Sequence, residues 1–363
     1  MLITDYVNKL KSDNEFFKFQ IENKTKDVIH NLYKYYKLLP KEYVKKYIYH
    51  IKEDHKENPL ATLYIESELG APLRQIELIK QLENNGYTLK NKSVLDIGCS
   101  NGALLLACHD AGANKIVGVD IDENRINSAK MLIGDKKIDL LTLDIVQHDL
   151  PEEYISFDII LATDVLEHVS DVKQFFCKIK RHLSQHNDDS FAYVSVFNKF
   201  CFHNIISEPH YNVPGMILLD YADAKNLWYH VRSKLNSTLE YEVFHWHTFE
   251  EYAEFCDNWG LELLPLGDYS NIEHSDIFTE DFKNKIDQFN SELKERIDNL
   301  LAANEFKIKL KDRLTLYCDE FSEDHHNYNG SHDNALYLYL KYYMQPMLMI
   351  IKNKRGHNGI TQV

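Results

Sequence analysis

The chain has 363 residues, of which 44% are hydrophobic, and it carries a formal net charge of -15. This length and apolar content are sufficient for a large buried core. A uniformly acidic protein repels phosphate backbones, so the charge argues against DNA or RNA as a partner. The six cysteines include no C-x-x-C pair, which argues against a zinc site or a disulfide framework and fits a reducing compartment.

The chain shows no pattern typical of secretion or of membrane insertion. Its first apolar stretch contains charges and precedes no small-residue cleavage site. The longest apolar run near the C-terminus, residues 346–351, is too short to cross a bilayer. We therefore expect a cytoplasmic protein without stable membrane insertion, whereas nothing in the sequence indicates its oligomeric state.

Residues 1–88 have helical spacing and few glycines, and prolines divide them into several expected helices. Within this N-terminal helical region, residues 34–52 interleave lysines with tyrosines. That pattern suits a basic surface for a membrane, a lipid-linked substrate or a nucleic acid. It also suits an amphipathic helix with its lysines in water, which is the interpretation we favour.

The run from Ser93 to Gly102, SVLDIGCSNG, combines a short apolar strand with a turn of small residues, and a helix-like segment follows. A backbone without bulky side chains can approach a ligand closely. From Gly98 the sequence reads GCSNGA, which lacks the G-x-G-x-x-G spacing of NAD-binding loops.

Further strand-like segments repeat the same arrangement, because each ends in a small or acidic residue. Ligands of open α/β sheets bind at the carboxyl ends of the strands, so the repetition predicts a ligand site there. The segments and the residues that end them are 115–119 with Asp120, 139–143 with Asp144, and 157–162 with Thr163 and Asp164.

The stretch from Ser93 to about Leu183 resembles the class I S-adenosylmethionine-dependent methyltransferases. Their first motif is an acidic residue followed by glycines at alternate positions, as in residues 96–102 (DIGCSNG), where Ser100 replaces the middle glycine. Residues 164–169, DVLEHV, are similar to a segment of the ubiquinone-biosynthesis type. The resemblance implies S-adenosyl-L-methionine as cofactor and a Rossmann-like α/β fold, whose seven-stranded sheet is mostly parallel with an antiparallel last strand.

The resemblance also implies which residues meet the cofactor. Asp120 would bind the ribose hydroxyls, Asp144 and Ile145 would lie at the adenine, and Asp96 would act indirectly by holding the loop through backbone hydrogen bonds. Arg74, in the helix before the sheet, is a candidate for the cofactor carboxylate. Asp120 as a helix N-cap and Asp144 as a turn residue remain alternatives. The full set is Arg74, Asp96, Gly98, Cys99, Ser100, Gly102, Asp120, Ile121, Asp144, Ile145 and Thr163.

After a helix over 171–183 and a fifth strand over 190–196, we expect regular structure to stop. Residues 198–247 form an insertion rich in aromatic residues and histidine. Loops in that position lie over the methyl end of the cofactor in this fold, so the insertion would select the acceptor.

A capping box of Thr248 and Glu251 predicts a helix that ends before Gly260. The remaining elements complete a methyltransferase domain over residues 89–355. They are a sixth strand over 261–266, a helical insertion over 280–343, a seventh strand over 347–352 and a flexible tail over 356–363.

A hydroxyl acceptor must lose its proton as it attacks, and histidine is a suitable base near neutral pH. Among 18 histidines, position favours His168, His210 and His245 as catalytic candidates. We expect an O-methyltransferase acting on a small-molecule substrate, a polar metabolite such as a sugar. Two alternatives are N- or C-methylation, for example of a quinone-like ring, and a non-catalytic cofactor-binding protein. The spacing demands no metal, although Mg²⁺ at Asp164 and Glu167 stays open.

Overall fold

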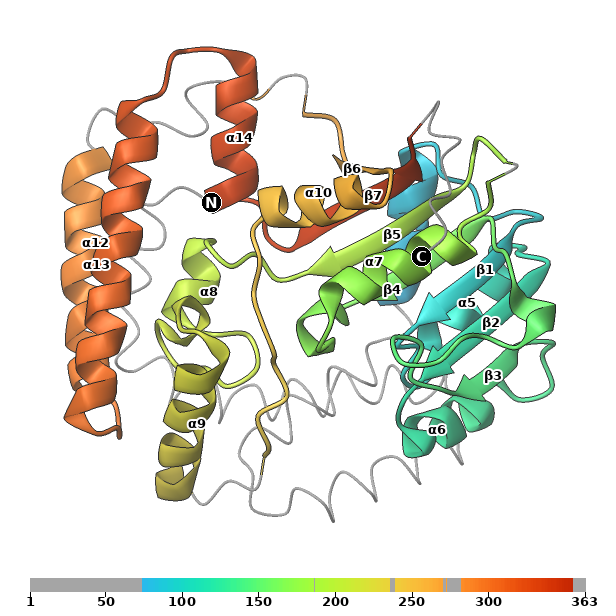
Figure 1. Ribbon diagram of the computed structural model, residues 1–363, viewed down its shortest axis with the longest axis horizontal. Helices are drawn as coiled ribbons and strands as arrows, with labels where there is room; N and C mark the ends of the chain where they lie inside the picture. The colour runs from blue at the N-terminus through green and yellow to red at the C-terminus, as the bar shows by residue number, and fades with distance from the viewer. Residues whose placement is uncertain (1–73, 186, 236–238, 270–271, 273–281, 355–363) are drawn as a thin grey trace, which may run out of the picture. The chain divides into compact units, whose positions relative to one another are not determined.

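The computed structural model describes residues 74–185, 187–235, 239–269, 272 and 282–354 (Figure 1). Of the expected N-terminal region, residues 74–84 form a helix and residues 1–73 lie outside the described residues. The lysine- and tyrosine-rich segment 34–52 and the expected flexible tail 356–363 also lie outside them.

The chain forms two compact units. The sheet unit comprises the described residues of Gln20–Ser195, Ala253–Leu266 and Leu348–Val363. The helical unit comprises those of Val196–Tyr252 and Gly267–Met347.

The sheet confirms the predicted topology. It has seven strands in the order β3-β2-β1-β4-β5-β7-β6, so that β7, the last strand in the chain, lies between β5 and β6 (Figure 1). The pairs of β1 with β2, β1 with β4, β2 with β3 and β4 with β5 are parallel, and β6 pairs with β7 antiparallel. The strands are β1 (Ser93–Ile97), β2 (Lys115–Asp120), β3 (Asp139–Thr142), β4 (Ile159–Thr163), β5 (Phe191–Val196), β6 (Leu261–Pro265) and β7 (Met347–Asn353).

The central strands are apolar on both sides, which is typical of parallel strands covered by helices. All six residues of β5 are buried, as are the first four of β4. Helix α7 (Val172–His182) buries Val172, Phe175, Phe176 and Ile179, whose spacing makes one apolar face. The other helices of this unit include α5 (Ala103–Asp110) and α6 (Glu123–Ile133), with single turns η1 (Glu152–Tyr154) and η2 (Leu166–His168).

In the helical unit, the described residues 282–342 between β6 and β7 are largely helical, as expected. Its core contains many aromatic rings; that of Phe202 lies 4.9 Å from that of Phe289, and that of Phe321 lies 4.9 Å from that of Tyr342. Its helices are α8 (Phe202–Ile206), η3 (Met216–Leu218), α9 (Tyr221–Leu235), α12 (Phe282–Asp298), α13 (Asn304–His326) and α14 (His332–Tyr342).

Helix α10 (Phe249–Asn258) begins with the expected capping box. The Thr248 amide donates to Glu251 Oε2 at 2.7 Å, and the Glu251 amide donates to Thr248 Oγ1 at 3.3 Å. Gly260 follows the helix with a φ of +63°. Among the described helices, none is both long enough and apolar enough to span a bilayer.

The expectation that regular structure stops after residue 196 is wrong for part of the insertion, because α9 lies within it. Helix α9 buries Ala224, Leu227, Trp228 and Val231, which have the spacing of one helical face. The Asp223 amide donates to Asp220 Oδ1 at 2.9 Å, an N-terminal cap. The helical spacing of these apolar residues was therefore present in the sequence. The many aromatic residues and histidines of the segment had instead suggested a loop.

Candidate functional site

The loop after β1 has a distinctive backbone conformation. Gly98, Ser100 and Gly102 have φ angles of +73°, +47° and +81°, a left-handed conformation at alternate positions. The amides of Gly98 and Cys99 donate to the Val119 carbonyl at 2.8 and 3.0 Å, which ties the loop to β2. Helix α5 begins at Gly102 without a side-chain cap. A helix N-terminus of this kind presents its amides to a ligand.

Close packing explains two of the small residues. A β-carbon on Gly98 would lie 2.4 Å from Val165 Cγ2, so a side chain there would displace the neighbouring residue. A β-carbon on Gly118 in β2 would lie 2.4 Å from Leu105 Cδ1, which allows α5 to pack directly on the strand.

The Asp120 carboxylate lies beside this loop. Its Oδ2 accepts from the Ser100 amide at 2.9 Å and its Oδ1 from the Asp122 amide at 2.9 Å. The alternative that Asp120 caps the following helix is wrong, because Asp122 is the cap and accepts from the Asn124 amide at 2.8 Å. Each carboxylate oxygen offers about two acceptor sites, so Asp120 keeps capacity for ligand hydroxyls.

Asp96 lies beneath the loop and is 1% exposed. Its Oδ2 accepts no hydrogen bond from any described residue, and the carbonyl of Val119 and the carboxylate of Asp120 hold the loop amides instead. Burial, together with the negative charge of Asp120, raises the pKa of Asp96 well above its usual value. The structure thus differs from the expectation that hydrogen bonds from Asp96 hold the loop.

The neighbouring strand ends supply other predicted residues. The Leu143 amide donates to the Asp120 carbonyl at 2.9 Å, which brings the end of β3 beside β2. Asp144 Oδ1 accepts from the amides of Val146 and Gln147 at 3.0 and 3.3 Å. Asp144 therefore closes a turn, and its role at the adenine stays a prediction.

The side chains of the remaining predicted residues differ in exposure. Ile121 is 69% exposed and presents an apolar surface beside the loop, whereas Cys99 and Ile145 are each 4% exposed. Cys99 can therefore meet a ligand only through its backbone. Thr163 is half-buried at the end of β4, and Arg74 is exposed at the start of the first described helix.

One residue at the loop escaped the sequence reasoning. Arg125 of α6 donates from Nη1 to Ser100 Oγ at 2.7 Å. Ser100 stands where the family has glycine, and its hydroxyl is thus held by a residue of α6. No local pattern pairs a loop serine with a residue in the second helix after the loop.

The three candidate bases fall in both units. His168 ends η2 in the sheet unit, while His210 and His245 belong to the helical unit. The ring of His245 lies 4.6 Å from that of His247, whose Nδ1 is 3.4 Å from Glu251 Oε2. Burial opposes ionisation of Glu251, but the contacts from His247 and the Thr248 amide lower its pKa to about 2.

His210 has a different environment. Its Nδ1 lies 3.1 Å from Oε1 of Glu208, a carboxylate whose side chain is 1% exposed. Sequence reasoning noted Glu208 only as a neighbour of Pro209. A glutamate two residues before a histidine is too common a pattern to identify such a pair.

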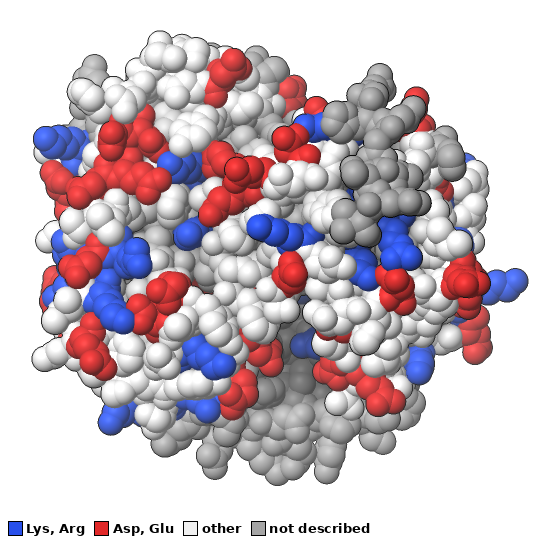
Figure 2. All heavy atoms as spheres, in the orientation of Figure 1, with Lys and Arg blue, Asp and Glu red and all other residues white. Residues whose placement is uncertain are grey.

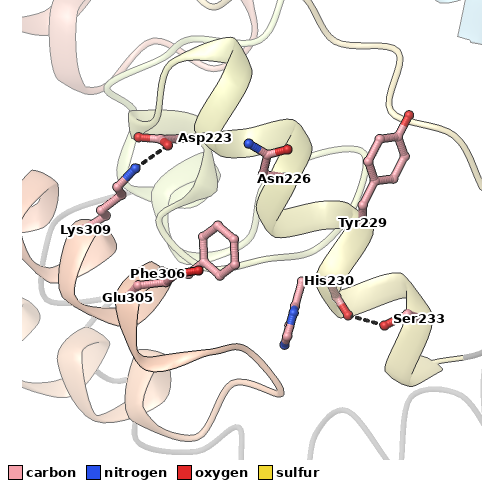
Figure 3. A pocket seen from close by; sticks show the side chains of 8 residues that line it. All are labelled: Asp223, Asn226, Tyr229, His230, Ser233, Glu305, Phe306 and Lys309. Carbon is pink, nitrogen blue, oxygen red and sulfur yellow. Dashed lines mark hydrogen bonds and ion pairs between the residues drawn. The ribbon is translucent and has the colours of Figure 1, made fainter.

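A separate hollow of about 630 Å³ lies between α9 and the start of α13 in the helical unit (Figure 3). Lys309 and Asp223, on opposite sides of it, form an ion pair with each other. The His230 ring lies 5.8 Å from that of Phe306. The hollow contains none of the predicted site residues. Its lining residues are Asp223, Asn226, Tyr229, His230, Ser233, Glu305, Phe306 and Lys309.

Comparisons with known proteins agree with the geometry of the loop. Residues 95–186 match the family model described as a methyltransferase domain. A ubiquinone biosynthesis O-methyltransferase of Pelagibacter ubique is 27% identical over 145 residues, which cover 40% of this chain and 55% of that relative. The corresponding enzyme of a Bradyrhizobium species is 37% identical over 123 residues, which cover 33% and 45%.

A tRNA U34 carboxymethyltransferase of Colwellia psychrerythraea is 32% identical over 124 residues, which cover 33% of this chain and 36% of that relative. The chain thus spans about half or less of the length of these relatives. The match falls on the sheet unit, where the first five strands and the loop lie. The matched residues 95–186 and the seven-stranded sheet thus identify in this chain a methyltransferase domain with the fold of the class I S-adenosylmethionine-dependent enzymes.

Proposed function

We propose that this protein transfers a methyl group from S-adenosylmethionine to an oxygen of a small polar metabolite. The observation that carries the proposal is the loop of residues 96–102, left-handed at alternate positions and tied through the Ser100 amide to the carboxylate of Asp120. A cytoplasmic location is part of the proposal, in keeping with cysteines that lack paired spacing.

The residues at the loop fit the chemistry of this cofactor. The Gly98 position has no room for a side chain, and the N-cap residue Gly102 has no side chain at the start of α5. Asp120 retains acceptor capacity for the ribose hydroxyls. Ile121 offers an exposed apolar face of the kind on which an adenine packs.

When bound, S-adenosylmethionine supplies a methyl group on a positively charged sulfur. The protein's part in such a direct displacement is largely to position the acceptor and to remove its proton. In the proposal, Asp120 would hold the ribose, the backbone of residues 98–102 would hold the methionine portion, and Asp144 and Ile145 would lie at the adenine. Arg74 would meet the cofactor carboxylate.

The acceptor class follows from two observations. Two relatives carry names that specify O-methylation, which favours oxygen. The insertion 198–247 is rich in aromatic side chains, which suit stacking against the ring of a sugar or of a phenol. We favour a sugar hydroxyl, with N- or C-methylation and non-catalytic cofactor binding as alternatives.

Transfer to RNA is a second candidate, because one relative is named for a tRNA nucleotide. The net charge of -15 opposes it. On the face drawn in Figure 2, described lysines and arginines are interspersed with acidic residues. Salt-sensitive binding of tRNA by the purified protein would favour this candidate over a small acceptor.

The acceptor is identified by measuring release of S-adenosylhomocysteine. We expect a signal with a sugar or nucleotide sugar in a panel that also contains phenols, quinols, amines and tRNA. A signal confined to amines or to tRNA would replace the proposed acceptor class. Tight S-adenosylmethionine binding without turnover on any panel member would favour the non-catalytic alternative.

The cofactor assignment is tested by calorimetry on D120A. Loss of a charged hydrogen-bond acceptor costs about 1.5–3 kcal/mol, so we expect S-adenosylmethionine to bind roughly 10- to 100-fold more weakly. D122A is the matched control, because it removes an aspartate two residues away that caps α6. Equal affinities of D120A and the unaltered protein would contradict the ribose assignment.

A further inference from the structure

We propose that the hollow between α9 and α13 binds the ring of a neutral sugar. Both helices belong to the helical unit, so the hollow is formed within one compact unit. It contains none of the residues assigned to S-adenosylmethionine or to proton removal. The inference therefore adds a binding site to the proposed function and does not depend on it.

The wall contributed by α9 is one face of that helix. Asp223, Asn226, His230 and Ser233 recur at intervals of three or four residues, which places them on the same side of the helix. Because a helix rises about 1.5 Å per residue, this wall is roughly 15 Å long. The volume of about 630 Å³ lies in the range of sites for small organic molecules. The hollow can thus take a whole ring.

Two contacts join the wall of α9 to the wall of α13. Lys309 of α13 forms an ion pair with Asp223 in the first turn of α9. Further along α9, the ring of His230 lies 5.8 Å from that of Phe306 of α13 (Figure 3). Both walls are therefore in place before a ligand binds, which lowers the cost of binding.

The charges of the lining disfavour an anionic ligand. The lining has two carboxylates, of Asp223 and Glu305, and one lysine, whose charge the Asp223 carboxylate already balances. A phosphate or a carboxylate would lose its hydration here without gaining an unpaired cation. The hollow therefore suits a ligand without negative charge.

The surroundings of Tyr229 disfavour an organic cation. The guanidinium carbon of Arg232 lies 4.2 Å from the centre of the Tyr229 ring, and Lys225 Nζ lies 5.8 Å from it. The attraction that this ring exerts on cations is thus already used within the chain. A cationic ligand beside the ring would be repelled by both side chains.

The polar groups of the lining match the hydroxyls of a sugar. Within the residues that the structure describes, the side chains of Asn226 and Glu305 form no hydrogen bond. An amide both donates and accepts, and a carboxylate accepts, so together they can pair with neighbouring hydroxyls. Ser233 Oγ donates to the His230 carbonyl at 2.7 Å and keeps capacity to accept. A purely apolar ring would leave these groups unpaired, which is costly.

The ring of Phe306 supplies the apolar contact that a sugar ring also needs. Phe306 is half-buried, and its side chain extends from α13 toward α9 (Figure 3). The C–H groups of a sugar can pack against an aromatic ring while its hydroxyls meet polar neighbours. The lining therefore fits a neutral sugar through both its aromatic and its polar groups.

The first test observes the hollow directly and needs no cofactor. The full chain is labelled with ¹⁵N-histidine, and the His230 signals are assigned by their loss in H230N. We expect glucose, galactose or mannose, or their methyl glycosides, to shift the His230 signals. Exposed His332, which lies outside the hollow and contacts the Tyr269 carbonyl, is the internal control. A preference for methyl glycosides indicates a sugar linked within a chain, and a preference for the reducing sugars indicates a free one.

The second test changes the aromatic contact. F306L keeps an apolar side chain but removes the flat ring, so we expect the sugar to bind about 3- to 10-fold more weakly in the same titration. F244L is the matched control, because the partly exposed ring of Phe244 lies outside the hollow and stacks on Tyr221. The histidine spectrum also shows whether each variant is folded.

The third test changes the polar contacts. N226A removes an amide from the lining, and we expect about 3- to 10-fold weaker binding. E305Q keeps the shape of the side chain but removes its charge, which should weaken binding about 2- to 5-fold, because charged acceptors form the stronger hydrogen bonds. E323Q makes the same change at an exposed glutamate of α13 outside the hollow and should leave the affinity unchanged.

Several outcomes would overturn the inference. Absence of a His230 shift with every neutral sugar at about 50 mM would show that the hollow is not a sugar site. A shift with glucose 6-phosphate or spermidine, but with no neutral sugar, would replace the ligand class. Equal sugar affinity in F306L, N226A and the unaltered protein would place the sugar elsewhere.

The proposed function is judged separately, by release of S-adenosylhomocysteine. If no sugar is methylated but the His230 signals shift, the proposed acceptor class fails and the sugar site stands. If a sugar is methylated but the His230 signals do not move, the proposed function stands and the sugar site in the hollow fails.

Discussion

The loop of residues 96–102 and the insertion 198–247 prepare their sites in different ways. In the loop the proposed contacts come from the backbone, because the residues are small or buried, as with Gly98 and Cys99. In the insertion the proposed contacts come from side chains, and the buried carboxylate of Glu208 is held by amides of its own turn. A site made by the backbone requires positions without a β-carbon, so that a ligand can approach closely. A site made by side chains requires neighbouring groups that hold those side chains in place.

The largest effect that would sharpen this comparison is expected for G98A. A left-handed alanine costs about 1–2 kcal/mol. Overlap with Val165 adds about 1–3 kcal/mol, because the new β-carbon would lie 2.4 Å from Cγ2. We expect a lower free energy of unfolding in urea and weaker S-adenosylmethionine binding by calorimetry.

G86A is the matched control for that variant. Gly86 also has a positive φ, +85°, but a β-carbon there would meet no atom within 4 Å. The free energy of unfolding of G86A should fall by about 1–2 kcal/mol because of the left-handed backbone alone. Its affinity for S-adenosylmethionine should stay unchanged. If G98A lost no more stability than G86A and bound the cofactor normally, close packing would not define the loop.

A second effect concerns Asp96, a buried carboxyl group at the start of the loop of residues 96–102. Burial and the charge of Asp120 raise its pKa, so the folded protein holds the proton more tightly than the unfolded chain does. The free energy of unfolding should therefore fall as the pH rises from about 4 towards the raised pKa. The fall should be about 1.4 kcal/mol for each pH unit that separates the pKa of the folded protein from that of the unfolded chain.

D96N should remove this pH dependence, and urea unfolding at pH 4.5 and 7.5 measures it. The variant should gain stability relative to the unaltered protein at the higher pH. The exposed residue Asp135 supplies the control D135N, which should leave the pH dependence unchanged. A pH dependence that persists in D96N would assign it to other groups.

The smallest effect is expected at the hydrogen bond between the side chains of Ser100 and Arg125. Arg125 donates to Ser100 Oγ at 2.7 Å, and a hydrogen bond of this kind contributes about 0.5–1.5 kcal/mol. S100G and R125M should each weaken S-adenosylmethionine binding by less than about tenfold, and the double variant should lose less than the sum. Additive losses in this double-mutant cycle would show that the contact does not support the loop.

The fold was predictable because its signals are local. The apolar runs that became β1 to β7 agree with the observed strands to within one or two residues at their ends. The capping box of Thr248 and Glu251 was predictable for the same reason. Such patterns depend on neighbours in sequence, and a parallel sheet covered by helices requires continuous apolar strands.

The site was only partly predictable because its contacts connect distant residues. Asp120 could be chosen from its place after β2, but the sequence did not show that Asp122 caps α6 in its stead. The hydrogen bond between Arg125 and Ser100 joins residues 25 positions apart. Glu208 is close to His210 in sequence, yet its importance comes from burial, which depends on packing by the rest of the helical unit.

The pairing of β6 with β7 has a consequence for how such a protein can diversify. The Leu266 amide donates to the Leu348 carbonyl at 2.8 Å, so the chain leaves the sheet and re-enters it at adjacent points. Residues 267–346 are thus an insertion between two strands that would otherwise form a simple hairpin. Lineages can exchange, trim or enlarge that stretch while the strands on either side keep their register.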